Sequence, residues 1–390
     1  MTASNAMNQL TSFTVPQSRA DITEDEIEAV AQTLRSGWLT SGPAVRKFEK
    51  AFSDYLGGKA HTTATNSATL GLTTALKALG IGPGDEVITT TNTFTATALA
   101  IYHLGATPVL VDIDHTLCID PNRIEAAITS RTRAIIPVHL GGLACDMDAI
   151  HDIASRKGLL VIEDAAHALP TSSRGEMVGA GRSAATVFSF YATKSITTGE
   201  GGMITCPDPA LAERMKRLRL HGINSDAFNR LNGNSWLYDV TEDGFKANMT
   251  DISASLGLVQ LAKLEKMWQR REKVAERYYE GLKGLPLTMP AKPLPNDRHA
   301  WHLFMVQLQP EARIHRNEFI SLMAGLGVQC SVHYVPLHRH TLWKKVLDFD
   351  VREFPVAEKA FSRSVSLPIF SSMTDSEVNT VIEATRSLLQ

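Results

Sequence analysis

The sequence lacks the features that mark secreted, metal-binding and membrane proteins. It has only 4 cysteines among 390 residues, widely separated and without a CxxC pair. This spacing gives neither a disulfide framework nor a metal-ligand set, so no metal site is expected. No apolar run reaches the ~18 residues that cross a bilayer, and the polar start MTASNAMNQLTSF has no signal-peptide apolar region. We expect a cytoplasmic protein with no membrane partner.

An excess of charge of one sign is also missing. The chain has 39 Lys and Arg against 41 Asp and Glu, a formal net charge of −2. Such a balance gives no general attraction to nucleic acid, so no nucleic-acid partner is expected, and any bound anion must be held locally. What remains is an ordinary globular composition, with 44% hydrophobic and 21% charged residues.

Apolar strands alternate with helical segments through the middle of the chain. Strands are expected at 85–90, 107–113, 132–140, 158–166, 184–190 and 201–206. Helices are expected at 23–34, 67–79, 95–104, 121–128, 147–157, 208–221 and 251–283, followed by a strand at 302–308 and a helix at 316–325. Because the strands are almost wholly apolar, they predict a mostly parallel sheet covered by helices on both faces.

The length and the order of these elements predict an α/β protein with two domains. We expect a flexible N-terminal arm at residues 1–14, then a large three-layer α/β/α domain at 15–265. A smaller C-terminal α/β domain is expected at 266–390, joined to the large domain by the charged helix at 251–283.

One lysine stands where a lysine is unexpected. Lys194 follows the predicted strand at 184–190, in FSFYATKSITTGEGGM (188–203), and lysine is seldom buried without a partner. It either reaches solvent from a loop or is held in a pocket as a nucleophile. In parallel sheets, ligands bind beyond the carboxyl ends of the strands, so polar residues that follow other strands should meet Lys194 there.

Each of those residues has an ordinary reading and a functional one. Asp164 in VIEDAAHA caps a helix or binds a metal, or it pairs with a cationic ring nitrogen. His167 is a core histidine or turns toward the same site. The NSATLGL turn (66–72) simply starts a helix or holds a phosphate, with Ser189 as a further hydroxyl donor. Phe94 belongs to the core or stacks on a planar ring.

Taken together, these residues are the groups that pyridoxal 5'-phosphate requires. The lysine forms a Schiff base with the cofactor, and the carboxylate keeps the ring nitrogen protonated so that the ring can accept electrons. The helix start holds the phosphate without a large net positive charge on the protein.

The chain resembles the sugar-nucleotide aminotransferases of fold type I, the DegT family, from about Val15 to its C-terminus. The matching stretches are SGWLTSGPAVRKFE (36–49), ALGIGPGDEVIT (78–89), RIEAAIT (123–129), AIIPVHLGG (134–142), VIEDAAHA (161–168), FSFYATKSITTGEGG (188–202), RLHGINSDAF (219–228), AWHLF (300–304) and SLPIF (366–370). The resemblance implies the fold of type I pyridoxal-phosphate transferases and activity as an aminotransferase.

The resemblance also implies a role for each matching residue. Lys194 is the Schiff-base lysine, and Asp164 pairs with the pyridine nitrogen. The other implied cofactor contacts are His167 at the ring hydroxyl, Phe94 stacked on the ring, and Ala68, Thr69 and Ser189 at the phosphate. Many relatives have glycine at position 68, but the alanine keeps the backbone N–H. Many also have an aromatic residue where Ala247 stands, so the local shape beside Asn248 differs from theirs.

The partner subunit enters the implied site through Asn248, which reaches the phosphate of the other chain. The expected assembly is therefore a homodimer with shared active sites. The implied substrates are L-glutamate and a nucleotide-linked 4-keto sugar. The substrate contacts expected on this basis are Trp38, Thr40, Arg219, His221, Arg230 and His333.

Two other functions remain open at this stage. One is a non-catalytic protein that binds pyridoxal phosphate and regulates. The other is a sugar dehydratase or lyase that uses the same cofactor, although relatives that dehydrate carry histidine where this chain has Lys194. The residues leave open whether the product enters lipopolysaccharide, another glycan or an antibiotic.

Overall fold

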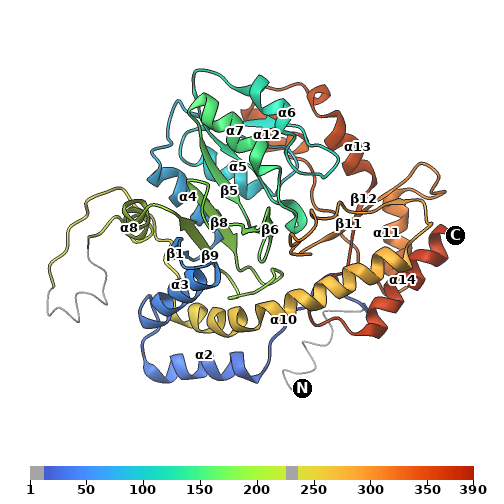
Figure 1. Ribbon diagram of the computed structural model, residues 1–390, viewed down its shortest axis with the longest axis horizontal. Helices are drawn as coiled ribbons and strands as arrows, with labels where there is room; N and C mark the ends of the chain where they lie inside the picture. Colours follow the sequence, from blue (N-terminus) through green and yellow to red (C-terminus); the bar gives the residue numbers. More distant parts are fainter. Residues whose placement is uncertain (1–12, 225–235) are drawn as a thin grey trace.

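The protein folds around one central sheet, shown in Figure 1 with helices on both of its sides. The computed structural model describes residues 13–224 and 236–390. Residues 1–12 of the expected N-terminal arm therefore lie outside the described residues.

The central sheet has seven strands and is mostly parallel, as the sequence predicts. Their order is β1 (His61–Thr65), β9 (Gly202–Cys206), β8 (Ala185–Ser189), β5 (Leu160–Asp164), β4 (Thr132–Ile136), β2 (Glu86–Thr90) and β3 (Thr107–Val111). In this sheet β9 runs antiparallel to both its neighbours, β1 and β8, and the other pairs are parallel. Strand β4 is shorter than predicted because Pro137 has no N–H to continue the ladder with β5, which pairs Ile135 with Val161 and resumes only at the bridge between Val138 and Asp164.

Helices cover both faces, which confirms the predicted α/β/α layers. Alternate strand residues such as Ile162 and Val87 pack under α4 (Ala68–Ala78), α5 (Thr95–Tyr102) and α8 (Pro209–Leu218). Their neighbours Val161 and Ile88 face the other side, under α6 (Pro121–Ile124), α7 (Met147–Lys157) and α13 (Pro355–Arg363). On that second side, α3 (Pro43–Tyr55) and the first half of α10 (Asp251–Gly281) cover the β8–β1 end, and α2 (Glu24–Ser36) packs on α10.

Local signals in the sequence set the ends of several helices. The side chain of Asp146 accepts the N–H of Ala149 and starts α7, while Gly158 ends it with a φ of 66°. A capping box starts α2, with the Thr23 N–H donating to Glu26 at 2.8 Å. None of the described helices is long and apolar enough to cross a bilayer.

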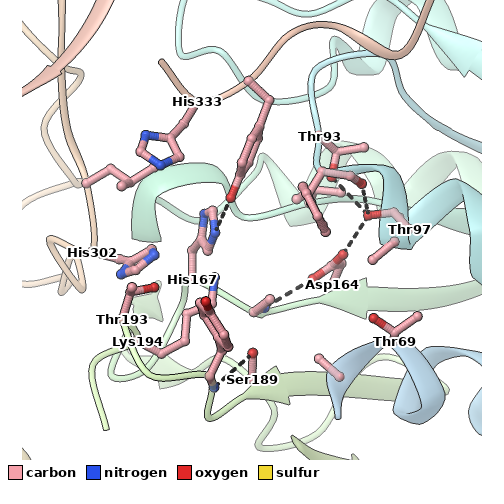
Figure 2. A pocket seen from close by; sticks show the side chains of 18 of the residues that line it. Thr69, Thr93, Thr97, Asp164, His167, Ser189, Thr193, Lys194, His302 and His333 are labelled. Carbon is pink, nitrogen blue, oxygen red and sulfur yellow. Dashed lines mark hydrogen bonds between the residues drawn. The ribbon is translucent and has the colours of Figure 1, made fainter. Parts of the chain in front are cut away.

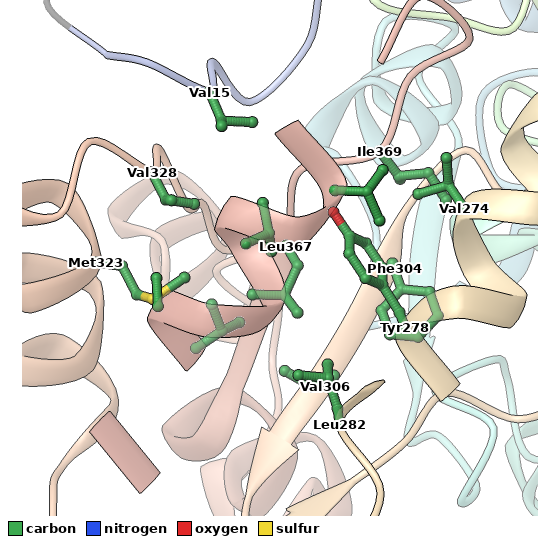
Figure 3. Close-up of a cluster of buried hydrophobic side chains, with 14 of the residues drawn as sticks. Val15, Val274, Tyr278, Leu282, Phe304, Val306, Met323, Val328, Leu367 and Ile369 are labelled. Carbon is green, nitrogen blue, oxygen red and sulfur yellow. The ribbon is translucent and has the colours of Figure 1, made fainter. Parts of the chain in front are cut away.

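A second, three-stranded sheet stands near the C-terminus and is antiparallel. It contains β10 (Leu287–Thr288), β11 (Phe304–Leu308) and β12 (Ser364–Leu367), beside α11 (Arg316–Gly325), α14 (Asp375–Leu389) and the end of α10. The smaller elements are β6 (Ser172–Ser173), β7 (Glu176–Met177) and α12 (Thr341–Val346). Figure 3 shows the core beside the three-stranded sheet, in which Tyr278 of α10 packs on Phe304 with ring centroids 5.0 Å apart.

The N-terminal segment joins this C-terminal core. Val15 pairs in parallel with Val328, and its N–H donates to the Gly327 carbonyl at 3.0 Å. Its side chain is fully buried among the residues of the C-terminal sheet and α11. The domain bounds at 15–265 and 266–390 stay a prediction, and α10 runs through the expected boundary.

Candidate active site

A cavity of about 590 Å³ lies beyond the carboxyl ends of the central strands, shown from close by in Figure 2. Strands β5 and β8 contribute their last residues, the starts of α4 and α5 form one wall, and segments near the C-terminus close another. The predicted site residues that line the cavity are Ala68, Thr69, Phe94, Asp164, His167, Ser189, Lys194 and His333. Residues far apart in the sequence thus meet where the strand pattern places them.

Asp164 is a buried carboxylate held by two hydrogen bonds. It accepts the Thr97 hydroxyl at 2.8 Å and the Ala166 N–H at 3.1 Å. Burial raises the pKa of this carboxyl, while the bonds from Thr97 and Ala166 act to lower it. A cationic group in the cavity would remove the cost of burying this charge, as expected for a partner of a protonated ring nitrogen.

Glu163, the residue before it on β5, belongs to a separate network. It accepts the His139 ring N–H at 2.8 Å and the Thr186 hydroxyl at 3.0 Å. Burial acts to raise the pKa of Glu163, but its hydrogen bonds and the electrostatic attraction of His139 together outweigh burial and lower the pKa. Successive strand residues point to opposite faces, so only Asp164 of the two carboxylates lines the cavity.

Lys194 lies in the cavity and not on an outer loop, which answers the question that its position in the sequence raises. Burial lowers its pKa from 10.5 to about 8, against the attraction of Asp164, which acts to raise it. The neutral, nucleophilic fraction of the amine near neutral pH is therefore far larger than in an exposed lysine.

The start of α4 is open to an anion. The Ser67 hydroxyl accepts the Leu70 N–H and caps the helix, and the first N–H groups of a helix have no partner within it. Gly202 of β9 passes so close that a Cβ there would lie 2.8 Å from the Ala68 nitrogen. The glycine that the sequence places in GEGG is thus needed to bring β9 against this turn.

Three imidazoles and one phenol gather at the wall opposite the helix start. The Gly141 N–H donates to His167 Nδ1 at 3.2 Å, and His167 Nε2 lies 3.1 Å from the Tyr334 hydroxyl. The ring centroids of His302 and His167 are 4.4 Å apart. Among the described residues the buried Nδ1 of His302 has no hydrogen-bond partner. Burial lowers the pKa of His167, of His302 and, to about 4, of His333. His333 therefore offers a neutral ring to a substrate and no positive charge.

Comparison with known proteins identifies the family of this chain. Residues 20–386 match the DegT/DnrJ/EryC1/StrS aminotransferase family. SpsC of Bacillus subtilis (strain 168), a spore coat polysaccharide biosynthesis protein, is 46% identical over 380 residues, which are 96% of this chain and 97% of SpsC. The chain belongs to this family.

Solved structures of similar proteins extend the match to the cofactor. Spr1654 of Streptococcus pneumoniae in its PMP form has a TM-score of 0.90 and 36% identity, covering 96% of this chain and 98% of that one; it was also solved in a PLP form. PseC of Helicobacter pylori, an aminotransferase involved in the biosynthesis of pseudoaminic acid, has a TM-score of 0.89 and 28% identity, over 96% of this chain and 99% of that one. This aminotransferase is thus a pyridoxal-phosphate-dependent enzyme that acts on sugars, with the expected type I fold.

The cavity of this aminotransferase fits the cofactor. Asp164 would hold the ring nitrogen, Phe94 would cover the ring, and the start of α4 with Ser189 would hold the phosphate. Lys194 would form the covalent bond. When bound, the cofactor supplies an aldehyde that exchanges amino groups and a ring that withdraws electrons from the reacting carbon.

Five predicted residues of the aminotransferase do not line this cavity: Trp38, Thr40, Arg219, His221 and Asn248. The Arg219 guanidinium pairs with Glu49 and donates to the Ala64 carbonyl at 2.6 Å, so within this chain it holds α3 against β1. Asn248 donates to the Ser41 hydroxyl at 2.7 Å. Arg230 lies outside the described residues.

The cavity residues that the sequence does not predict include Thr97, His302 and Tyr334. A signal for Thr97 existed, because it follows Phe94 by three residues and so shares a face of α5. His302 stands in AWHLF and Tyr334 directly follows His333 in SVHYVPLH, two stretches already singled out. Neither stretch carries a local pattern that separates a residue of the site from a residue of the core.

Proposed function

We propose that this aminotransferase moves an amino group from L-glutamate to C4 of a nucleotide-linked 4-keto sugar, giving a 4-amino sugar nucleotide and 2-oxoglutarate. The observation that carries the proposal is Lys194, with its lowered pKa, in one cavity with Asp164. The sequence motifs resemble those of UDP-4-amino-4-deoxy-L-arabinose aminotransferase, which supports amination at C4. The glycan-related roles of SpsC and PseC support a product that enters lipopolysaccharide or another glycan.

The residues favour transamination over the other two functions. Lys194 Nζ can move a proton between the substrate carbon and the cofactor carbon, because its neutral form is accessible near neutral pH. A dehydratase of this kind would carry histidine at this position, and a regulator would not need a nucleophile with a lowered pKa.

The visible absorption spectrum tests the proposal. Protein loaded with pyridoxal phosphate should lose its visible band when L-glutamate is added, because the cofactor then carries the amino group. The band should return on addition of a UDP-linked 4-keto sugar, with a 4-amino sugar nucleotide identified by mass spectrometry. A band that L-glutamate leaves unchanged would exclude this donor, and a band that no 4-keto sugar nucleotide restores would exclude this acceptor class.

We further propose a homodimer with shared active sites. Among the described residues that line the cavity, Lys194 is the sole lysine or arginine, although a phosphate and substrate carboxylates must bind there. Four of the exposed large apolar side chains lie at the cavity or near predicted substrate residues. Phe94 and Tyr191 line the cavity, Leu39 stands between the predicted substrate residues Trp38 and Thr40, and Trp236 follows the segment that contains Arg230. A second copy that covers them would bring its own Asn248 and its 36–42 and 219–224 segments to the cavity.

Mixed dimers test the shared site. Lys194→Ala and Asn248→Asp should each be inactive alone, because the aspartate would place a negative charge against the phosphate of the neighbouring site. After unfolding and refolding together, about a quarter of wild-type activity should return, since half of the dimers are hybrids with one intact site. The matched control is a mixture of Lys194→Ala with Asp164→Asn, which lie in the same cavity and should give no recovery. Recovery in both mixtures, or in neither, would contradict shared sites.

We also propose that the enzyme acts in the cytoplasm. All four cysteines are free thiols, and three of them are buried, as is usual in a reducing compartment.

A further inference from the structure

The hydrogen bonds around His167 have a fixed direction. The Gly141 N–H can only donate, so His167 Nδ1 must accept with a lone pair. Burial and the nearby charge of Lys194 keep the pKa of His167 far below its ordinary value, so the ring is neutral and carries one proton. That proton is on Nε2, and it is donated to the Tyr334 oxygen 3.1 Å away.

The proton of Tyr334 itself is therefore turned away from His167. Burial, together with the negative charge of Asp164, raises the pKa of Tyr334, so the phenol keeps its proton at every working pH. The ring of Tyr334 lines the cavity, and its centroid lies 5.6 Å from the centroid of the Phe94 ring. A hydroxyl that is already an acceptor for one neighbour needs an acceptor for its own proton, and a ligand in the cavity is the group that can supply it.

We propose that Tyr334 donates a hydrogen bond to the carbonyl oxygen of the keto substrate during amino transfer. This inference rests on the proposed function only in that the acceptor is a ketone. As the amine nitrogen bonds to the carbonyl carbon, the electron pair of the C=O bond moves to oxygen, and the hydrogen bond stabilises that negative charge. The oxygen then leaves as water with two hydrogens from the amino group, and Tyr334 keeps its own proton throughout.

The neighbouring hydrogen bonds favour this role for Tyr334 over His167 and over Nδ1 of His333. His167 donates its one ring proton to the Tyr334 oxygen. His333 Nδ1 forms a hydrogen bond with the Ser366 hydroxyl at 2.8 Å. Lys194 must be free to carry the proton that moves between carbon atoms. The phenol thus remains a permanently protonated donor in this part of the cavity.

The test compares wild type with Tyr334→Phe in single-turnover half-reactions. The amino donor is taken from a panel of the standard amino acids that includes L-glutamate, and the matching keto acid is used for the reverse step. We expect about a 10²-fold lower maximum rate in both directions, a half-saturation concentration unchanged within about twofold, and an unchanged spectrum and affinity for pyridoxal phosphate. Tyr102→Phe, which removes a hydroxyl outside the cavity, is the matched control and should behave as wild type.

Three other outcomes would overturn the proposal. A raised half-saturation concentration with an unchanged rate would mean that the phenol only binds substrate. A changed spectrum or cofactor affinity would mean that it acts on the cofactor, and no change at all would remove it from the reaction. If the wild type reacts with an amino acid other than L-glutamate, the proposed donor fails while the test of Tyr334 still proceeds with that amino acid.

Discussion

Replacing Lys194 by alanine is expected to lower kcat about 10⁴-fold, because the proton transfer between carbon atoms loses its base. Among the described residues that line the cavity there is no second lysine to take over. The cofactor should still bind through its phosphate and ring nitrogen, but without the covalent bond. Turnover is measured with the amino donor that reacts with the wild type, and cofactor retention by absorption after gel filtration.

Two observations separate this loss from a loss of fold. Burial lowers the pKa of Lys194, which means that the buried ammonium destabilises the folded protein. The melting temperature of the cofactor-free protein should therefore be unchanged or higher in the alanine variant. A small primary amine added to the variant should restore part of the rate, since it can occupy the space of the missing side chain. A variant with more than a tenth of wild-type kcat would disprove the role of Lys194.

Replacing Asp164 by asparagine is expected to lower the maximum rate about 10³-fold and to weaken cofactor binding. The amide keeps an oxygen that can accept the hydrogen bonds of Thr97 and Ala166, so the local structure should persist. What it loses is the negative charge that would keep the ring nitrogen protonated. The measurements are single-turnover rates and the dissociation constant of pyridoxal phosphate.

The neighbouring carboxylate provides the control for Asp164. Glu163→Gln removes one negative charge from the same strand, but from the network of His139 and Thr186 outside the cavity. This variant should retain its rate within about tenfold while losing some thermal stability. Equal rate losses in both variants would mean that the general electrostatic field matters and that the contact of Asp164 with the ring nitrogen does not.

Periodicity and strand ends predicted much of this architecture. The helix Met147–Lys157 has the predicted bounds because Asp146 and Gly158 are local start and stop signals. Lys194, Asp164 and Phe94 line one cavity because the carboxyl ends of parallel strands share one edge of the sheet. Here the rule concerns backbone topology, and the topology follows from wholly apolar strands that alternate with helical segments.

Other features depend on contacts that no local pattern encodes. Arg219 was expected to meet substrate, but Glu49, 170 residues away, pairs with it inside this chain. Tyr334 reaches the cavity from the C-terminal part and finds its partner His167 at a separation of 167 residues. A lone tyrosine or arginine has the same sequence context in a core, at an interface or in a site, so only the folded chain distinguishes these environments.

The pairing of Val15 with Val328 sets the order in which the enzyme can be completed during synthesis. Gln17 and Ser18, which follow Val15, form part of the cavity wall. They leave the ribosome early, but the segment that holds them is made about 300 residues later, which at roughly 5 to 20 residues per second is a delay of about 15 to 60 s. The nascent chain therefore carries an open cavity until its last quarter emerges, and the cofactor can find its full set of contacts only on a nearly finished polypeptide.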